Sequence, residues 1–296
     1  MIEYKTIREL CSIVVDCPHS TPKWTEDGKI VVRNNNIKNG RINLTAPSFT
    51  DDEHFRQRIK RAKPQSGDLI ITREAPIGEV GMIPANIECC LGQRMVLLRV
   101  DQSICDNFYL LYSLQSPYVK NQISWSEGTG TTVSNLRIPH LENIKIPYIP
   151  LELQKRVSSV LRVIEEKIFN NSKINENLAD QAQAIYQQYF LIEADPNWPL
   201  GHLSDLIDVK YGKDHKKLAD GVYPVYGSGG IMRYVERPLY EKESVLIPRK
   251  GTLNNVMYVN QPFWSVDTMF YTEMKQANVA KFVYHFVKSK DLASMN

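Results

Sequence analysis

Polar and basic side chains gather in one short loop of the chain, and their types suit contacts with nucleic acid. Residues 34–41 read NNNIKNGR, and Arg33 precedes them. The Asn39-Gly40 pair predicts a tight hairpin turn. Asn side chains can bond to base edges, and Arg or Lys side chains can bond to phosphates. The same residues also fit an ordinary polar hairpin loop, and taken alone they favour that plainer interpretation.

A basic helix is predicted a few residues after this loop. Residues 50–53 (TDDE) match a capping box, so a helix should begin there and end before Pro64. Arg56, Lys60 and Lys63 then lie on one face at helical spacing. Such a face can hold a phosphate backbone or simply face solvent, and the sequence favours neither interpretation.

The chain carries no persuasive catalytic constellation. The Gly/Thr-rich segment 126–136 lacks the GK[ST] ending of a P-loop, and no methyltransferase-type cofactor turn is present. Glu165-Glu166-Lys167 spells the Glu-x-Lys of some nucleases, but it falls within a predicted amphipathic helix and is interpreted as a solvated face. Six histidines are scattered without metal-ligand spacing. The sequence therefore predicts a binding protein with no enzyme activity, no cofactor and no metal.

Composition limits the class of protein further. The 296 residues, 43% hydrophobic and 23% charged, are enough for two domains with real cores. A net charge of +3 does not by itself indicate nucleic-acid binding, so local basic patches must carry that interpretation. The five cysteines are odd in number and form no CxxC pair, and no apolar run or N-terminal signal points to a membrane or to export. We therefore expect a cytoplasmic protein.

A long helix is predicted to separate the segments that carry the loop residues. Pro150 to Phe190 contains no further Pro or Gly, and apolar residues recur at three- and four-residue steps. Polar residues in the middle of such a stripe fix register and partner number. A long surface helix packed on its own domain is the plainer alternative. The predicted pairing residues are Leu153, Val157, Val160, Ile164, Ile168, Asn171, Asn175, Leu178, Ile185 and Tyr189.

The segments on either side of this helix resemble each other. VLIPRKGTLNNVMYV (245–259) aligns with LIITREAPIGEVGMI (69–83), so that Arg249 matches Arg73. Residues 281–286 likewise align with residues 107–112. The order and spacing of elements predict a duplication. The expected fold is α/β (α+β), with two tandem domains of the same fold, the second of them incomplete at its C-terminal end.

Three stretches resemble one known family. The run GTTVSNLRIPHLENIKIPYIPLELQKRVSSVLRVIEEKI (130–168) resembles the end of a target-recognition domain and the following helix in specificity subunits of type I restriction-modification systems. PVYGSGGI (224–231) resembles the opening of a second recognition domain. SVLIPRKGT (244–252), followed by PFWSVDT (262–268), continues the match, and GDLII (67–71) is the same element in the first half.

The resemblance implies a DNA-recognition subunit that directs methyltransferase and restriction subunits to a bipartite target on double-stranded DNA. It implies a first target-recognition domain at 1–150, a spacer helix at 151–190 and a second, C-terminally truncated recognition domain at 191–296. The expected DNA contacts are loop cations and amides. In the first domain they are Arg33, Asn34, Asn36, Lys38, Arg41 and Arg73, and in the second they are Lys213, Lys216, Lys217, Arg249 and Lys250.

Two questions stay open at this point. The main alternative is a truncated, silent copy that no longer binds DNA and acts only as an assembly scaffold. The second concerns the apolar stripe of the helix at 151–190, which would be costly to leave in water. It could pair with the same helix of a second copy to form a homodimer, or methyltransferase subunits could cover it.

Overall fold

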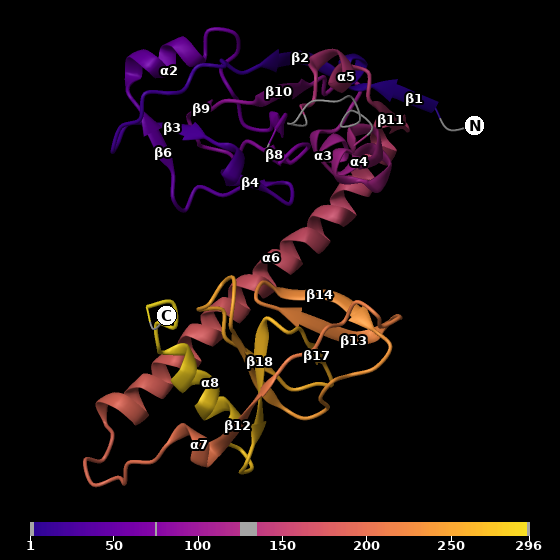
Figure 1. Cartoon of the computed structure of the whole chain (residues 1–296). Coiled ribbons are helices and arrows are strands. Elements are labelled where there is room, and N and C mark those ends of the chain that lie inside the picture. The colour runs from indigo at the N-terminus through magenta and orange to yellow at the C-terminus, as the bar shows by residue number, and fades with distance from the viewer. Residues whose placement is uncertain (1–2, 75, 125–134, 295–296) are drawn as a thin grey trace. The chain divides into compact units, whose positions relative to one another are not determined.

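The computed structural model describes residues 3–74, 76–124 and 135–294, and it divides into two compact units (Figure 1). The first unit comprises residues 1–170 and the second residues 171–296. The boundary falls inside the long helix α6 (Leu151–Gln187), so each unit contains one half of that helix. Each unit is described by itself below.

The first unit is built on a four-stranded antiparallel sheet with the strand order β2-β10-β7-β8. Residues Leu69 and Ile71 of β7 face one core, and Ile70 between them faces another, so the strand is buried on both faces. This explains its uninterrupted apolar sequence. The strands are β2 (Cys11–Asp16), β7 (Leu69–Thr72), β8 (Val80–Met82) and β10 (Met95–Val100).

Smaller sheets and helices complete this unit. β3 pairs with β9 in parallel and with β6 antiparallel, while β4–β5 and β1–β11 are two-stranded ribbons. The remaining strands are β1 (Glu3–Thr6), β3 (Lys29–Val32), β4 (Ile37–Lys38), β5 (Arg41–Ile42), β6 (Ser48–Thr50), β9 (Cys89–Leu91) and β11 (Lys145–Tyr148). The helices are α1 (Ile7–Leu10), the 3-10 turn η1 (Asn34–Asn36), α2 (Asp52–Arg58), α3 (Asn107–Gln115), α4 (Pro117–Ser124) and α5 (Ile138–Glu142).

The second unit repeats the central architecture. Its main sheet has the order β12-β18-β15-β16, and β13 pairs with β17 in parallel and with β14 antiparallel. The strands are β12 (Ile207–Tyr211), β13 (Asp220–Gly227), β14 (Gly230–Val235), β15 (Ser244–Pro248), β16 (Met257–Val259), β17 (Trp264–Ser265) and β18 (Met269–Met274). The helical segments after α6 are the π-helical turn η3 (Gln188–Ile192), α7 (Leu203–Leu206) and α8 (Ala280–Lys288).

Strand register confirms the duplication that the sequence predicts. Thr72 pairs with Met95 at the end of β7, and Pro248 pairs with Met269 at the end of β15. The next backbone amide follows the same rule, because Arg73 donates to the Arg94 carbonyl and Arg249 to the Thr268 carbonyl. Segments 69–83 and 245–259 therefore hold equivalent places in their sheets.

The predicted long helix is present, and each half of it packs on its own unit. In the first half, Gln154 and Ser158 are buried and bond to Asp106 at the start of α3. In the second half, Tyr186 is buried, stacks on His285 of α8 and packs against the tilted ring of Phe282. Figure 1 shows α8 next to the C-terminal part of α6.

Candidate nucleic-acid interface

The Asn-rich loop is an insertion that only one of the two units carries. In the first unit residues 33–47 connect β3 to β6, whereas in the second unit only residues 228–229 connect β13 to β14. The predicted turn is confirmed, because Asn39 and Gly40 both have positive φ and join β4 to β5. Five of the eleven predicted DNA contacts lie in this insertion.

Two of those five are structural amides. The Asn36 side chain is 8% exposed, accepts from the Arg33 amide at 2.8 Å and donates to the Asn43 carbonyl at 3.0 Å. Asn34 donates to the Glu74 carbonyl at 2.8 Å and is half-buried. These bonds hold the two ends of the loop together, so both amides already have partners within the chain, and their contact with DNA stays a prediction.

Arg33 and Lys38 are exposed, and they are the cations of this loop that suit contact with a polyanion. The Arg33 guanidinium stacks on the Trp24 ring at 5.0 Å, and Trp24 is itself 44% exposed. An aromatic ring under an arginine restricts the side chain while leaving its donors in solvent. Trp24 is absent from the sequence-based predictions, although its position in a polar segment before β3 could have drawn attention to it.

Arg41 serves a different purpose, because it connects the hairpin to α6. Its Nε donates to Glu165 at 3.1 Å, and its guanidinium lies 4.2 Å from the centre of the Phe169 ring. Tyr112 donates to the other oxygen of Glu165 at 2.7 Å. Glu165 is therefore half-buried and doubly bonded, which corrects its interpretation as part of a solvated face.

The basic face predicted after residue 50 is only partly formed. Helix α2 ends at Arg58 rather than near residue 63, and Asp51 is its N-cap. Arg58 is 7% exposed and donates to the carbonyls of Pro18, Ser20, Leu91 and Gly92. Because its side chain turns inward, Arg58 is removed from the surface and bonds the helix end to two neighbouring segments, residues 18–20 and 91–92.

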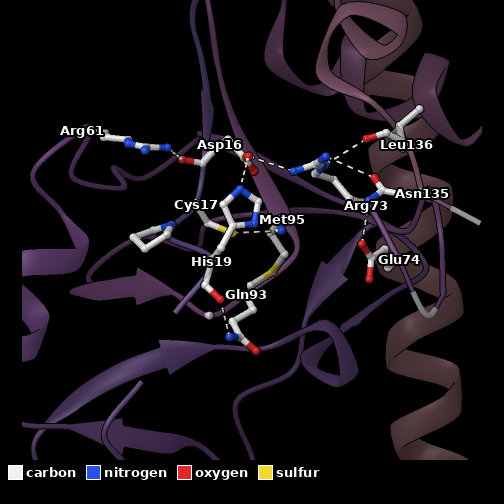
Figure 2. Close-up of polar contacts among 12 residues, drawn as sticks. Asp16, Cys17, His19, Arg61, Arg73, Glu74, Gln93, Met95, Asn135 and Leu136 are labelled. Carbon is white, nitrogen blue, oxygen red and sulfur yellow. Dashed lines mark hydrogen bonds and ion pairs between the residues drawn. The ribbon is translucent and has the colours of Figure 1, made fainter. Parts of the chain in front are cut away.

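Arg73 is held in a network of the first unit's own groups (Figure 2). Its guanidinium donates to Asp16 at 2.8 Å, to the Leu136 carbonyl at 2.9 Å and to the Asn135 amide oxygen at 3.1 Å. The Arg73 side chain is only 11% exposed, and the Asp16 side chain 17%. With its donors occupied in this way, Arg73 holds residues 135–136 in place, and its contact with DNA stays a prediction.

The cations predicted in the second unit are all exposed. Lys213 follows the end of β12, and its amide donates to the Ser265 carbonyl at 2.8 Å. Arg249 donates to the Asp267 carbonyl at 2.9 Å and stacks on Tyr211 and Phe270. Lys213 and Arg249 thus border the same stretch, residues 265–268, and exposed Lys250 follows Arg249. Lys216 and Lys217 lie further along the β12–β13 connection.

The apolar stripe of α6 is exposed in the described chain. Gln154, Ser158 and Glu165, which contact the first unit, lie roughly 100° round the helix from the centre of the stripe. The stripe residues themselves are between 37% and 62% exposed: Leu153, Val157, Val160, Ile164, Ile168, Leu178, Ile185 and Tyr189. Asn171 and Asn175 are exposed beside them. In its first half the helix therefore packs through polar groups, in its second half it packs through Tyr186, and the stripe residues stay exposed in both halves.

Other kinds of site find no support in the residues that the structure covers. In residues 3–74, 76–124 and 135–294, no three His, Cys, Asp or Glu side chains are grouped so as to hold a metal ion. All five cysteines are buried and unpaired, and burial raises the pKa of Cys89 to about 12. None of the helices within those residues combines the length and apolar composition needed to cross a membrane. Residues 125–134, most of the Gly/Thr-rich segment, lie outside the described residues.

Comparison with known proteins identifies the class to which this duplicated architecture corresponds. The family model for the type I restriction modification DNA specificity domain matches residues 2–179 and again residues 196–296. The chain therefore belongs to this family, and it contains two copies of its domain.

Individual relatives agree with the family match. A putative type I restriction enzyme MjaX specificity subunit from Methanocaldococcus jannaschii is 32% identical over 111 residues, which are 38% of this chain and 25% of that protein. The MjaIX specificity subunit of the same organism is 24% identical over 218 residues, which are 67% of this chain and 46% of that protein. The matches span a quarter to a half of the length of the curated relatives.

A solved structure shares the fold. The crystal structure of the type I restriction-modification system S subunit from M. genitalium aligns with a TM-score of 0.58 and 21% identity, covering 99% of this chain and 79% of that one. At this identity the likeness concerns the fold. It supports the arrangement of two related domains joined by a long helix.

Proposed function

We propose that the chain is a DNA-recognition subunit of a type I restriction-modification complex, which directs methyltransferase and restriction subunits to a target on double-stranded DNA. The observation that carries this proposal is the match of one DNA-specificity domain family to both halves of the chain. The names of the relatives, which are specificity subunits, support the same function. The subunit itself would contribute recognition and no chemistry.

The placement of the basic side chains supports a role in DNA binding. Arg33 and Lys38 in the first unit, and Lys213, Arg249 and Lys250 in the second, are exposed cations on loops at the ends of strands. Loops carried by a rigid sheet are the usual place for binding residues. Buried, unpaired cysteines also suit a reducing compartment, so we expect the chain to act in the cytoplasm.

The exposed stripe of α6 supports a partner along this helix. Each aliphatic side chain that becomes buried contributes about 1.5–3 kcal/mol, so the stripe favours association. Within the proposed complex the partner is either a methyltransferase subunit or α6 of a second copy. One observation favours the homodimer, because Asn171 and Asn175 could fix the register of two paired apolar stripes.

A genome-wide comparison tests the recognition function. Methylated adenines are mapped in cells with and without the gene for this chain. We expect a set of modified sites sharing one sequence to disappear when the gene is removed. An unchanged methylation map, together with a purified chain that shows no salt-dependent DNA binding, would favour the assembly scaffold instead.

A further inference from the structure

Equivalent strand ends in the two units differ in charge. Asp16 pairs with Val96 at the end of β2, and Tyr211 pairs with Phe270 at the end of β12. The next residues, Cys17 and Gly212, donate the same backbone hydrogen bond to Met95 and Met269. The strand ends are therefore aligned residue by residue, and Pro18 of the first unit corresponds to Lys213 of the second.

The neighbouring strand gives the other half of the comparison. Because Arg73 and Arg249 are equivalent, Glu74 corresponds to Lys250. The first unit has two carboxylates, Asp16 and Glu74, around its arginine, Arg73. In the second unit Tyr211 replaces Asp16 and Lys250 replaces Glu74. Lys213 adds a further cation at the position of Pro18.

In the first unit these charges neutralise one another. Arg73 pairs with Asp16 at 2.8 Å, and Arg94 pairs with Glu74 at 3.0 Å. Glu74 also accepts from the Asn135 amide at 2.7 Å. Figure 2 shows Arg73, Asp16 and Asn135 turned towards one another, so the cluster is closed on itself.

In the second unit the equivalent arginine, Arg249, lies on two aromatic rings, which we call the aromatic platform. The Arg249 guanidinium is 4.8 Å from the centre of the Tyr211 ring and 5.1 Å from that of Phe270. The two rings meet edge to face at 5.1 Å, and Tyr211 is 63% exposed. An arginine stacked on a ring is held in place while most of its donors face solvent. We call Tyr211, Lys213, Arg249 and Lys250 the basic ledge.

We propose that the basic ledge binds the phosphate backbone of double-stranded DNA, and that the equivalent strand ends of the first unit do not. The inference rests on the proposed function and adds to it an unequal division of backbone contacts between two domains of one fold. In the second unit Lys213 and Arg249 bond to residues 265–268, and Lys250 follows Arg249 in the chain, whereas in the first unit Arg73 pairs with Asp16. Phosphate contacts position a protein on DNA without reading its sequence.

The test measures the salt dependence of binding by the full-length chain to a mixed-sequence DNA duplex. For B-form DNA the slope of log K against log salt changes by about 0.9 for each phosphate neutralised. The variant Lys213→Ala/Arg249→Ala/Lys250→Ala should therefore bind with a slope shallower by about 2.7. Because all three side chains are exposed, its thermal unfolding should match that of the wild type.

A matched control removes the same charge elsewhere in the second unit. Arg237, Lys242 and Lys281 are exposed and lie outside the basic ledge, so their triple alanine variant should keep the wild-type slope. A wild-type chain that binds DNA, with equal slopes in both triple variants, would overturn this inference and leave the proposed function standing. A wild-type chain without salt-dependent binding would contradict both.

The aromatic platform provides a second, independent measurement. Tyr211→Leu removes the ring beneath Arg249, whereas Tyr211→Phe keeps it. We expect Tyr211→Leu to weaken duplex binding severalfold and Tyr211→Phe to restore it. Equal affinity of Tyr211→Leu and wild type would show that the ring does not orient the arginine for DNA.

Discussion

Arg73 and Arg249 show how one side chain at one position can serve two purposes. Arg73 donates to three acceptors of its own unit, while Arg249 uses one carbonyl and two ring faces and remains exposed. Both were predicted to contact DNA, and those assignments remain untested by the structure. The geometry favours Arg249 as the contact and favours Arg73 as the residue that holds Asn135 and Leu136 in place.

A prediction about stability follows for this pair. Arg73→Ala would leave Asp16, whose side chain is only 17% exposed, with His19 at 3.0 Å as its remaining basic neighbour, and would leave the Leu136 carbonyl without its donor. Breaking a buried ion pair from one side costs about 3–5 kcal/mol. We therefore expect Arg73→Ala to lower the free energy of unfolding by about 3 kcal/mol in urea titrations. Arg249→Ala should lower it by less than about 1 kcal/mol. Equal effects would refute the distinction.

Single residues also show where the sequence stops being informative. The Asn39-Gly40 turn follows from local backbone preference, so it could be predicted. The partners of Arg73 lie 57 and 62 residues away in the chain, at Asp16 and Asn135. A local reading has no means of finding such contacts. Exposed loop cations and structural cations therefore cannot be distinguished in the sequence, because the partners of a structural cation become neighbours only in the folded sheet.

At the scale of elements, a long and regular apolar pattern was enough to predict where a helix lies, but the sequence did not predict where a short helix ends. The helix α6 has the expected position because its apolar pattern is long and regular. Helix α2 ends five residues earlier than its sequence suggests. There Arg58 turns inward to four carbonyl groups, and this tertiary gain outweighs the helical preference of the following residues.

The contact of α6 with α8 is expected to depend on pH. His285 stacks on Tyr186 with ring centres 5.8 Å apart, and its Nδ1 lies 2.8 Å from Gln183 Oε1. Burial, with a smaller contribution from Lys288, lowers the pKa of His285 below its usual 6.5. The unfolded chain therefore binds the proton more readily than the folded chain does. The contribution to stability is complete above pH 6.5 and declines as the pH falls below that value.

A variant isolates this contribution from the other histidines. His285→Phe keeps an aromatic ring against Tyr186 but removes the titrating group. Thermal unfolding of wild type and variant is compared between pH 7 and pH 5, the range in which a histidine of lowered pKa acts. We expect the wild type to lose more stability than His285→Phe as the pH falls. Parallel pH profiles would show that protonation of His285 is not linked to folding.

At the scale of the whole molecule, α6 belongs to both units and exposes its apolar residues along both halves. Packing on each unit uses other residues of the helix, among them Gln154, Ser158 and Tyr186. The apolar stripe is thus exposed and is not buried in the core of either unit. A stripe of this kind is a typical pairing surface for another helix.

The last prediction concerns that partner. If α6 pairs with α6 of a second copy, the purified 34.0 kDa chain should have twice that mass by light scattering. Ile164, in the middle of the first half of the stripe, is 52% exposed, so Ile164→Asp should leave the fold intact and break the dimer. A charge buried in an apolar helix pair is strongly unfavourable.

Val163→Asp supplies the control for this experiment. Val163 is 65% exposed and lies about 100° round the helix from Ile164, away from the stripe. It should dimerise like the wild type, because it adds the same charge outside the pairing surface. A wild-type chain that scatters as a monomer would rule out the homodimer. In that case the stripe would be expected to bind a methyltransferase subunit, and Ile164→Asp should then weaken assembly with that subunit while Val163→Asp does not.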